Sequence, residues 1–300
     1  MNLKLSIFIN AGTVPLEIAI RHGFFQAAGL DVEIEGTRSS IEQMVGIIDG
    51  RYDIAATAID NVIAYNCGQG AAKTKAKSDL KVFLGSASYR LPLVVGPSIA
   101  SFEGLRGKTI AVDALNTGFA FLLREMLEIN GLNSLDYVFE AVGAPKERWQ
   151  SVKDGKAAGA LLNAHFEAIA HAQNCKTLTS SPDPWDNYEG NTFCAGPEFL
   201  ADGPVEAFTT AVLEGVEFTK DPANLEVVAV ALDQHLGGLD PDRARLTAMS
   251  LQGPDSILKD GLPVSRSGIE NVLRLREKYT QVELGLSPEV VCDPRANLRN

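Results

Sequence analysis

Five turns, each between an expected strand and an expected helix, carry the side chains that could bind or transform a small molecule. Ligands of open parallel sheets bind beyond the carboxyl ends of the strands, where helix N-termini offer unpaired N–H groups and the positive end of a dipole. The first three turns offer Asn10, Gly12, Thr13, Arg38, Ser39, Ser40, Asp60 and Asn61. The other two offer Asp113, Asn116, Thr117, Gly118, Phe119, Asn163, His165 and Phe166. All five turns are expected on one edge of their sheets, so these residues form the candidate ligand-binding set.

The charges in this set favour an organic anion. Arg38 is the notable residue, because its planar guanidinium suits a carboxylate or sulfonate bidentately. Asp60 and Asp113 could receive a cationic or hydroxyl group, or they could only orient their loops. Aromatic cover could come from Tyr89, Phe119, Phe166 and Trp185.

Each of these residues also has a structural interpretation. Thr13, Ser40, Asn61 and Asn163 are equally suited to cap a helix, and Ser40 followed by Gln43 fits a capping box. Phe119 and Phe166 could be core residues. The long loop over residues 180–188 could cover a ligand or be a surface excursion.

His165 is the candidate for acid–base chemistry if the protein is an enzyme. A histidine at such a turn could bind the ligand or move a proton, and more often it is a plain hydrogen-bonding residue. No cluster of metal-ligating residues and no dinucleotide fingerprint stands out in the sequence, so we expect neither a metal nor a cofactor.

Composition narrows the class of protein. The 300 residues are 45% hydrophobic and 22% charged, as in ordinary folded proteins, and they suffice for two domains. A net charge of -11 argues against a nucleic-acid partner, and the longest apolar runs are too short to span a membrane. Four cysteines permit disulfides without requiring them, and buried thiols are the simpler expectation: Cys67, Cys175, Cys194 and Cys292.

Strands and helices alternate through the first two thirds of the chain, which predicts an α/β fold with mainly parallel sheets. The first series has strands at 3–9, 31–35, 53–57 and 80–84, and helices at 15–28, 40–49 and 61–67. After an apolar crossing at 91–96, the second series has strands at 108–112, 136–142 and 158–162, and helices at 118–129, 145–154 and 165–173. A return strand is expected at 191–195, followed by four helices at 204–219, 222–236, 241–252 and 266–279.

Four blocks of sequence resemble the periplasmic substrate-binding proteins of ABC importers, in the branch of sulfonate-binding and thiamine-precursor proteins. The blocks are PLEIAIRHGFFQAAGLDVEIE (15–35), DGRYDIAATAIDNVIAY (49–65), FEGLRGKTIAVDALNTGFAFLLREMLEINGL (102–132) and ERWQSVKDGKAAGALL (147–162). The resemblance implies the two-lobed type II architecture, with a ligand cleft between the lobes and the C-terminal helices packed on lobe one. Lobe one would be 1–90 plus 196–300, and lobe two 91–195.

Three functions follow from the resemblance. The first hypothesis is a non-enzymatic receptor that binds a small anionic organic ligand and delivers it to an ABC permease. The rival is a cytosolic enzyme of the same fold, such as a decarboxylase, hydrolase or isomerase acting on a small acid, which could be aromatic. A cytosolic sensor is the third. The compartment stays open: periplasmic if an export signal was trimmed, cytoplasmic if Met1 is the native start.

Overall fold

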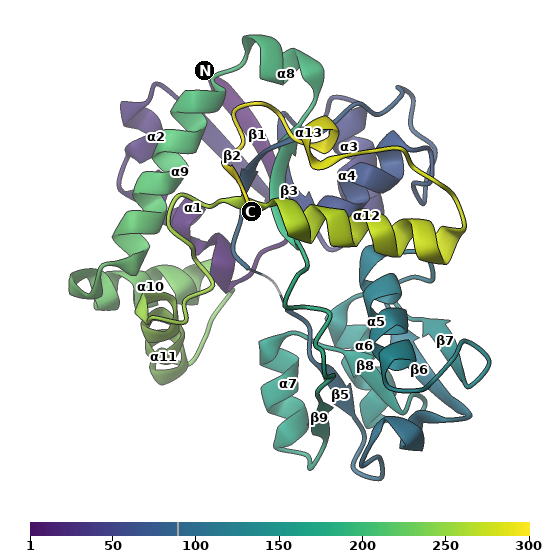
Figure 1. The fold of residues 1–300 in the computed structure, drawn as a ribbon. Coiled ribbons are helices and arrows are strands. Elements are labelled where there is room, and N and C mark those ends of the chain that lie inside the picture. The colour runs from purple at the N-terminus through teal and green to yellow at the C-terminus, as the bar shows by residue number, and fades with distance from the viewer. Residues whose placement is uncertain (89) are drawn as a thin grey trace. The chain divides into compact units, whose positions relative to one another are not determined.

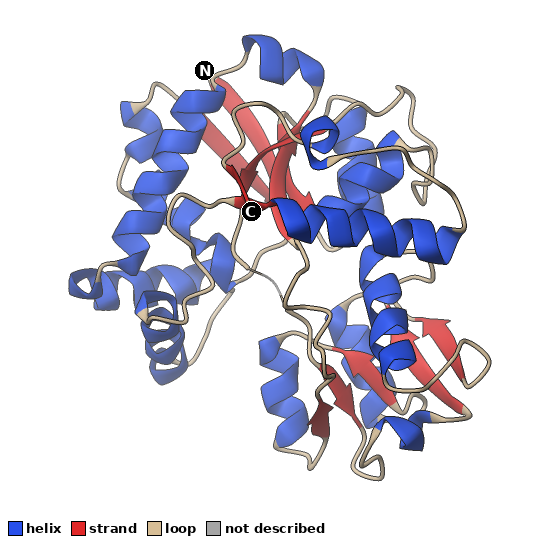
Figure 2. Cartoon of the chain, viewed as in Figure 1, coloured by secondary structure: helices blue, strands red, loops and turns tan. Residues whose placement is uncertain are grey.

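The computed structural model describes residues 1–88 and 90–300, and internal contacts divide the chain into two compact units. The first unit comprises Met1–Tyr89, Glu189–Glu270 and Gly285–Asn300, and the second comprises Arg90–Tyr188 and Asn271–Leu284. Tyr89, considered above as aromatic cover, lies outside the described residues. Each unit holds one five-stranded sheet flanked by helices, as the α/β pattern predicted (Figure 2).

The sheet of the first unit has the strand order β2-β1-β3-β10-β4. β1 is parallel to β2 and β3, whereas β10 runs antiparallel to both β3 and β4. Alternating apolar residues in β1 place Leu3, Leu5 and Ile7 in the core. The strands are β1 (Asn2–Ile7), β2 (Asp31–Gly36), β3 (Ile54–Ala58), β4 (Lys81–Gly85) and β10 (Asn191–Ala195). Because β10 pairs with β3 and β4, it belongs to the first unit. The chain therefore rejoins the first unit at Glu189, before this strand, and not at residue 196 as expected.

Helices cover both faces of this sheet, with α3 and α4 on one side and α1, α2 and α9 on the other (Figure 1). The expected helix over 15–28 is two helices, because Gly23 adopts a left-handed conformation with φ of 74°. The helices wholly within this unit are α1 (Val14–Arg21), α2 (Phe24–Ala27), α3 (Ser40–Ile48), α4 (Ile59–Asn66), α8 (Pro197–Asp202), α9 (Val205–Lys220), α10 (Leu225–His235), α11 (Pro241–Gln252) and α13 (Pro288–Val291).

The C-terminal helices α9, α10 and α11 pack on the first unit, as the resemblance implied. The expected helix over 222–236 begins as a single 3-10 turn, Pro222–Asn224, before α10. A small parallel pair, β11 (Val264–Ser265) and β12 (Leu298–Arg299), and the short helices α8 and α13 were not predicted.

The sheet of the second unit has the order β7-β6-β8-β5-β9. β6 is parallel to β7 and β8, and β5 is antiparallel to β8 and β9. The strands are β5 (Leu93–Val95), β6 (Lys108–Val112), β7 (Tyr137–Ala141), β8 (Gly159–Leu161) and β9 (Lys176–Leu178), the last of which was not predicted. The helices are α5 (Gly118–Ile129), α6 (Pro145–Lys153) and α7 (Ala164–His171).

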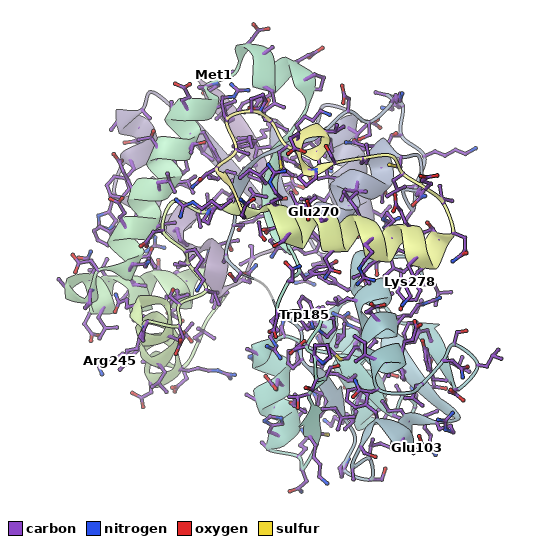
Figure 3. The ribbon with its side chains drawn as sticks, in the orientation of Figure 1. Met1, Glu103, Trp185, Arg245, Glu270 and Lys278 are labelled. Carbon is purple, nitrogen blue, oxygen red and sulfur yellow. The ribbon has the colours of Figure 1, made fainter. Side chains whose placement is uncertain are left out.

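The last long helix, α12 (Arg266–Thr280), does not follow the expectation that it packs only on the first unit. Its residues from Asn271 onward group with the second unit. The reason is a set of contacts with α5, centred on Glu125, which accepts hydrogen bonds from Arg274, Lys278 and Tyr279. Figure 3 labels Lys278 near the C-terminal end of α12.

Candidate functional site

The candidate turns of the first unit lie at one edge of its sheet. β1, β2 and β3 run parallel, so the turns that follow them, at residues 10–13, 37–40 and 59–61, stand at the carboxyl ends of three neighbouring strands. β6 and β8 are likewise parallel, so the turns at 113–118 and 162–166 share one edge of the second sheet.

The first turn is held by its own polar groups. Asn10 Oδ1 accepts a hydrogen bond from the Gly12 amide at 2.9 Å, and Thr13 Oγ1 accepts one from the Asn10 amide at 3.1 Å. Thr13 is buried and its hydroxyl also lies 2.8 Å from His235 Nε2. Burial lowers the pKa of His235, so this histidine is held neutral.

Gly12 serves close packing between two turns of the same edge. A Cβ built on Gly12 would lie 2.4 Å from the Cβ of Ala87, which follows β4. Such a distance is too short for two carbon atoms, so the glycine lets these turns approach one another. The structure thus gives Gly12 a packing role beside the ligand-approach role that the sequence suggested.

The second turn corrects the assignment of the cap. Ser39, and not Ser40, is the N-cap of α3, and its Oγ accepts a hydrogen bond from the Glu42 amide at 3.2 Å. Ser40 is the first residue of the helix. Both serines have a polar residue three positions later, so sequence spacing alone could not tell which serine caps the helix. In the structure the Ser39 amide donates to Thr37 Oγ1 at 3.1 Å, which keeps Ser39 in the turn before the helix.

Replacing Ser39 with alanine is expected to destabilise the protein by roughly 1 kcal/mol, because one N-terminal amide of α3 loses its acceptor. Ser40→Ala is the matched control and should change the free energy of unfolding by less than about 0.5 kcal/mol. Urea denaturation of the two variants checks this. Equal losses in both variants would contradict the cap at Ser39.

Gln43 has a role that sequence analysis missed. Its Nε2 donates to the Ser6 carbonyl at 3.0 Å and to the Ala56 carbonyl at 3.1 Å, near the carboxyl ends of β1 and β3. The side chain is fully buried, so the amide joins α3 to both strands behind the second turn. Its place on the buried face of α3, beside Met44 and Ile47, was the available signal.

Arg38 lies in the same turn and is exposed. It directly precedes the N-cap of α3, whose first amides point along the helix axis toward the turn. A guanidinium and a helix N-terminus together present positive charge, which suits an anion.

The third turn is also corrected, because α4 begins at Ile59 and not at Asn61. Asp60 and Asn61 therefore belong to the first helical turn, and Ala58 is the N-cap. Asn61 Nδ2 donates to Thr57 Oγ1 at 3.0 Å, so Asn61 does not cap the helix. Asp60 is buried, with 2% of its surface exposed.

In the second unit, Asp113 follows β6 and has 28% of its side chain exposed. Thr117 Oγ1 donates to Asp113 Oδ1 at 2.9 Å and also caps α5 by accepting from the Ala120 amide at 3.2 Å. Arg148 Nη1 lies 4.0 Å from Asp113 Oδ1. Burial raises the pKa of Asp113, and the positive charge of Arg148 opposes this rise.

Arg276 is a second residue that sequence analysis missed. This arginine of α12 is 1% exposed, its guanidinium lies 5.1 Å from the centre of the Phe121 ring, and its Nη2 donates to the Asn116 carbonyl at 3.4 Å. It therefore supports the turn that carries Asp113 and Thr117. An arginine in the apolar stripe of α12, seven residues after Ile269, was the available signal.

The last candidate turn precedes α7. Asn163 caps this helix, with Oδ1 accepting from the Phe166 amide at 3.1 Å. His165 is exposed, and its ring meets that of Phe166 edge to face at 4.9 Å. Phe166 also packs against the core of the second unit, so its structural interpretation holds.

Aromatic side chains gather at the start of α5. The Phe119 ring lies 5.9 Å from the Trp185 ring and 6.4 Å from that of Tyr188. Trp185 belongs to the long loop before β10 (Figure 3) and is 7% exposed. An ion pair between Arg90 and Asp183 holds this loop. Trp185 and Phe119 thus form one cluster beside the turn of Asp113 and Thr117.

Three further features concern metal-ligating groups, membrane-spanning helices and cysteines. Among residues 1–88 and 90–300, no group of three or more metal-ligating side chains occurs. Within the same residues, no helix has the length and apolar character needed to cross a bilayer. Cys175, Cys194 and Cys292 are buried thiols, and burial raises the pKa of Cys194 to about 12.

Comparison with known proteins gives one family and many structures. The family model described as NMT1/THI5 like matches residues 10–224. No curated protein matches the chain in sequence.

Three solved structures illustrate the shared fold. The ligand-binding component of an ABC-type import system from Staphylococcus aureus, with zinc bound, has a TM-score of 0.76 at 13% identity, covering 99% of this chain and 98% of that one. The alkanesulfonate-binding protein SsuA from Xanthomonas axonopodis pv. citri, bound to MOPS, has a TM-score of 0.70 at 15% identity, covering 97% and 96%. The periplasmic nitrate-binding protein NrtA from Synechocystis PCC 6803 has a TM-score of 0.64 at 15% identity, covering 77% and 65%. These likenesses show that the chain has the two-lobed fold of periplasmic binding proteins.

Proposed function

The chain belongs to the NMT1/THI5-like family, and on this premise we propose that it is the solute receptor of an ABC importer and binds a small organic anion. The turn that carries Arg38, at the carboxyl edge of the sheet of the first unit, is the proposed contact for the anionic group. An ABC permease is the partner that this function requires.

The observation that carries the proposal is the position of Arg38. Its exposed guanidinium directly precedes the capped N-terminus of α3, at the edge of a parallel sheet. Two independent sources of positive charge therefore stand in one turn, and the chain as a whole carries a net charge of -11. Such a turn is suited to a carboxylate or sulfonate.

The names of similar structures support a receptor over the enzyme alternative. They are an import-system component, an alkanesulfonate-binding protein and a nitrate-binding protein. A receptor needs only a ligand that binds one of its conformations more tightly than the other. It requires no proton transfer by His165.

Trp185 offers a direct assay, since the chain has two tryptophans. In a Trp149→Phe variant, Trp185 beside Phe119 is the only indole, and its emission should change saturably when a ligand contacts the candidate turn that begins α5. In the reverse variant, Trp185→Phe, the remaining Trp149 lies in the core of the second unit and its emission should stay constant. We expect this pattern with at least one member of a panel of C2 to C6 sulfonates and carboxylates.

Thermal unfolding supplies the independent measurement. A ligand at 100 times its Kd should stabilise the protein by about 2.7 kcal/mol. Neither a fluorescence change nor a rise in Tm with any member of the panel would refute the proposed function.

A further inference from the structure

Ile9 is an exposed apolar residue at the carboxyl edge of the first sheet. It follows β1, and 47% of its surface is exposed. A Cβ built on Gly36, the last residue of β2, would lie 2.6 Å from Ile9 Cδ1 and 3.1 Å from Ile9 Cγ1. The side chain of Ile9 therefore lies across the backbone of Gly36, two residues before Arg38. The glycine permits this position, since a residue with a Cβ would push the isoleucine away.

Ile41 lies close to the same turn of the chain. It belongs to the first turn of α3, three residues after Arg38, and is 42% exposed. Side chains in a helix lean toward the N-terminus of that helix, so Ile41 leans toward the turn that carries Arg38. The core of the first unit does not account for this isoleucine, because the buried residues of α3 are Gln43, Met44, Gly46 and Ile47.

Two exposed isoleucines thus border the turn in which Arg38 and the start of α3 present positive charge. Single exposed apolar residues are common on protein surfaces and need no explanation. Here both stand beside the charge that the proposed function assigns to an anion, and Ile9 is held there by its contact with Gly36. Covering such side chains is favourable for a hydrocarbon group, whereas a polar group would lose hydrogen bonds to water.

We infer that Ile9 and Ile41 select anions whose charged group is attached to a hydrocarbon part, which packs on these two side chains while Arg38 binds the charge. This selectivity rests on the proposed function and deepens it, because it assigns two specificity-determining residues. All three residues belong to the first unit, so the contact needs no residue of the second.

Two series of probes test the selectivity by isothermal titration calorimetry. They are the 1-alkanesulfonates from methanesulfonate to butanesulfonate, and the carboxylates from acetate to pentanoate. In at least one series, each added CH₂ group should tighten binding by roughly two- to fourfold, the upper value being that of a fully buried CH₂. 2-Hydroxyethane-1-sulfonate has nearly the size of propane-1-sulfonate but ends in a hydroxyl, and it should bind more weakly than propane-1-sulfonate.

The double variant Ile9→Ser/Ile41→Ser should reduce the gain per CH₂ group to less than about 1.5-fold. The shortest probe should bind this variant as it binds the wild type, which also shows that the variant is folded. Each single variant should lose part of the gain. Ile20→Ser is the matched control, since Ile20 is an isoleucine of α1 that is 37% exposed, and it should keep the wild-type gain.

The outcomes separate this selectivity from the proposed function. Wild-type affinities that do not rise with chain length, or a gain that persists in the double variant, would overturn the selectivity and leave the proposed function intact. An equal loss of the gain in Ile20→Ser would also overturn it. If no member of either series binds the wild type, the selectivity and the proposed function both fail.

Discussion

Arg38→Met is expected to weaken the binding of an organic anion by roughly 10- to 100-fold, because a hydrogen bond to a charged group is worth about 1.5–3 kcal/mol. Arg38 is exposed, so its loss should leave the Tm unchanged. Titration calorimetry with the ligand identified from the panel, at two salt concentrations, measures the effect. The wild-type affinity should fall more with salt than that of the variant.

Two further variants make the result specific. Arg38→Lys keeps the charge but loses the planar fork, so an intermediate affinity is expected. Arg245→Met removes an exposed arginine of α11 that pairs with Glu226, and it should bind the ligand as tightly as the wild type (Figure 3). If Arg38→Met and Arg245→Met behave alike, the anion is not recognised at the turn before α3.

Local sequence predicted those elements whose ends carry strong signals. β6, α5, β10 and α11 have the bounds that were expected, and the helices α6 and α11 begin at prolines. The helix over 15–28 failed because its apolar spacing continues across Gly23, so periodicity alone gives no break.

The supports of the candidate turns could not be predicted for a different reason. Thr13 and His235 are 222 residues apart, and Asn116 and Arg276 are 160 residues apart. No local pattern links such pairs, since the contact exists only after α10 and α12 have packed. The candidate residues themselves are easier to find, because the end of a parallel strand is a local feature.

The contact between α5 and α12 leads to the second large effect. Glu125 is 8% exposed and accepts from Arg274 Nη2 at 3.0 Å, Lys278 Nζ at 2.7 Å and the Tyr279 hydroxyl at 2.8 Å. Glu125→Gln removes the charge that joins these donors, and we expect the second unit to lose roughly 1–3 kcal/mol of stability. Both tryptophans belong to this unit, so urea denaturation followed by their emission reports its unfolding.

Glu128→Gln is the matched control, since Glu128 shares Lys278 and Tyr279 with Glu125 but is 51% exposed. An exposed pair contributes about 0–1 kcal/mol, so this variant should be nearly neutral. Equal losses in the two variants would mean that burial of Glu125 adds nothing to the contact.

The pH dependence separates the charge of Glu125 from its packing. Burial alone would raise the pKa of Glu125, but the hydrogen bonds from Lys278 and Tyr279 and the charge of Arg274 outweigh it and lower the pKa below its ordinary value of 4.5. A carboxylate with a lowered pKa stabilises the folded state above its unfolded pKa, and the contribution disappears as the pH falls through the folded value. The difference in stability between wild type and Glu125→Gln should therefore be constant from pH 7 to about pH 5 and shrink below it. A difference that stays the same at pH 3 would show that the loss comes from packing and not from the charge.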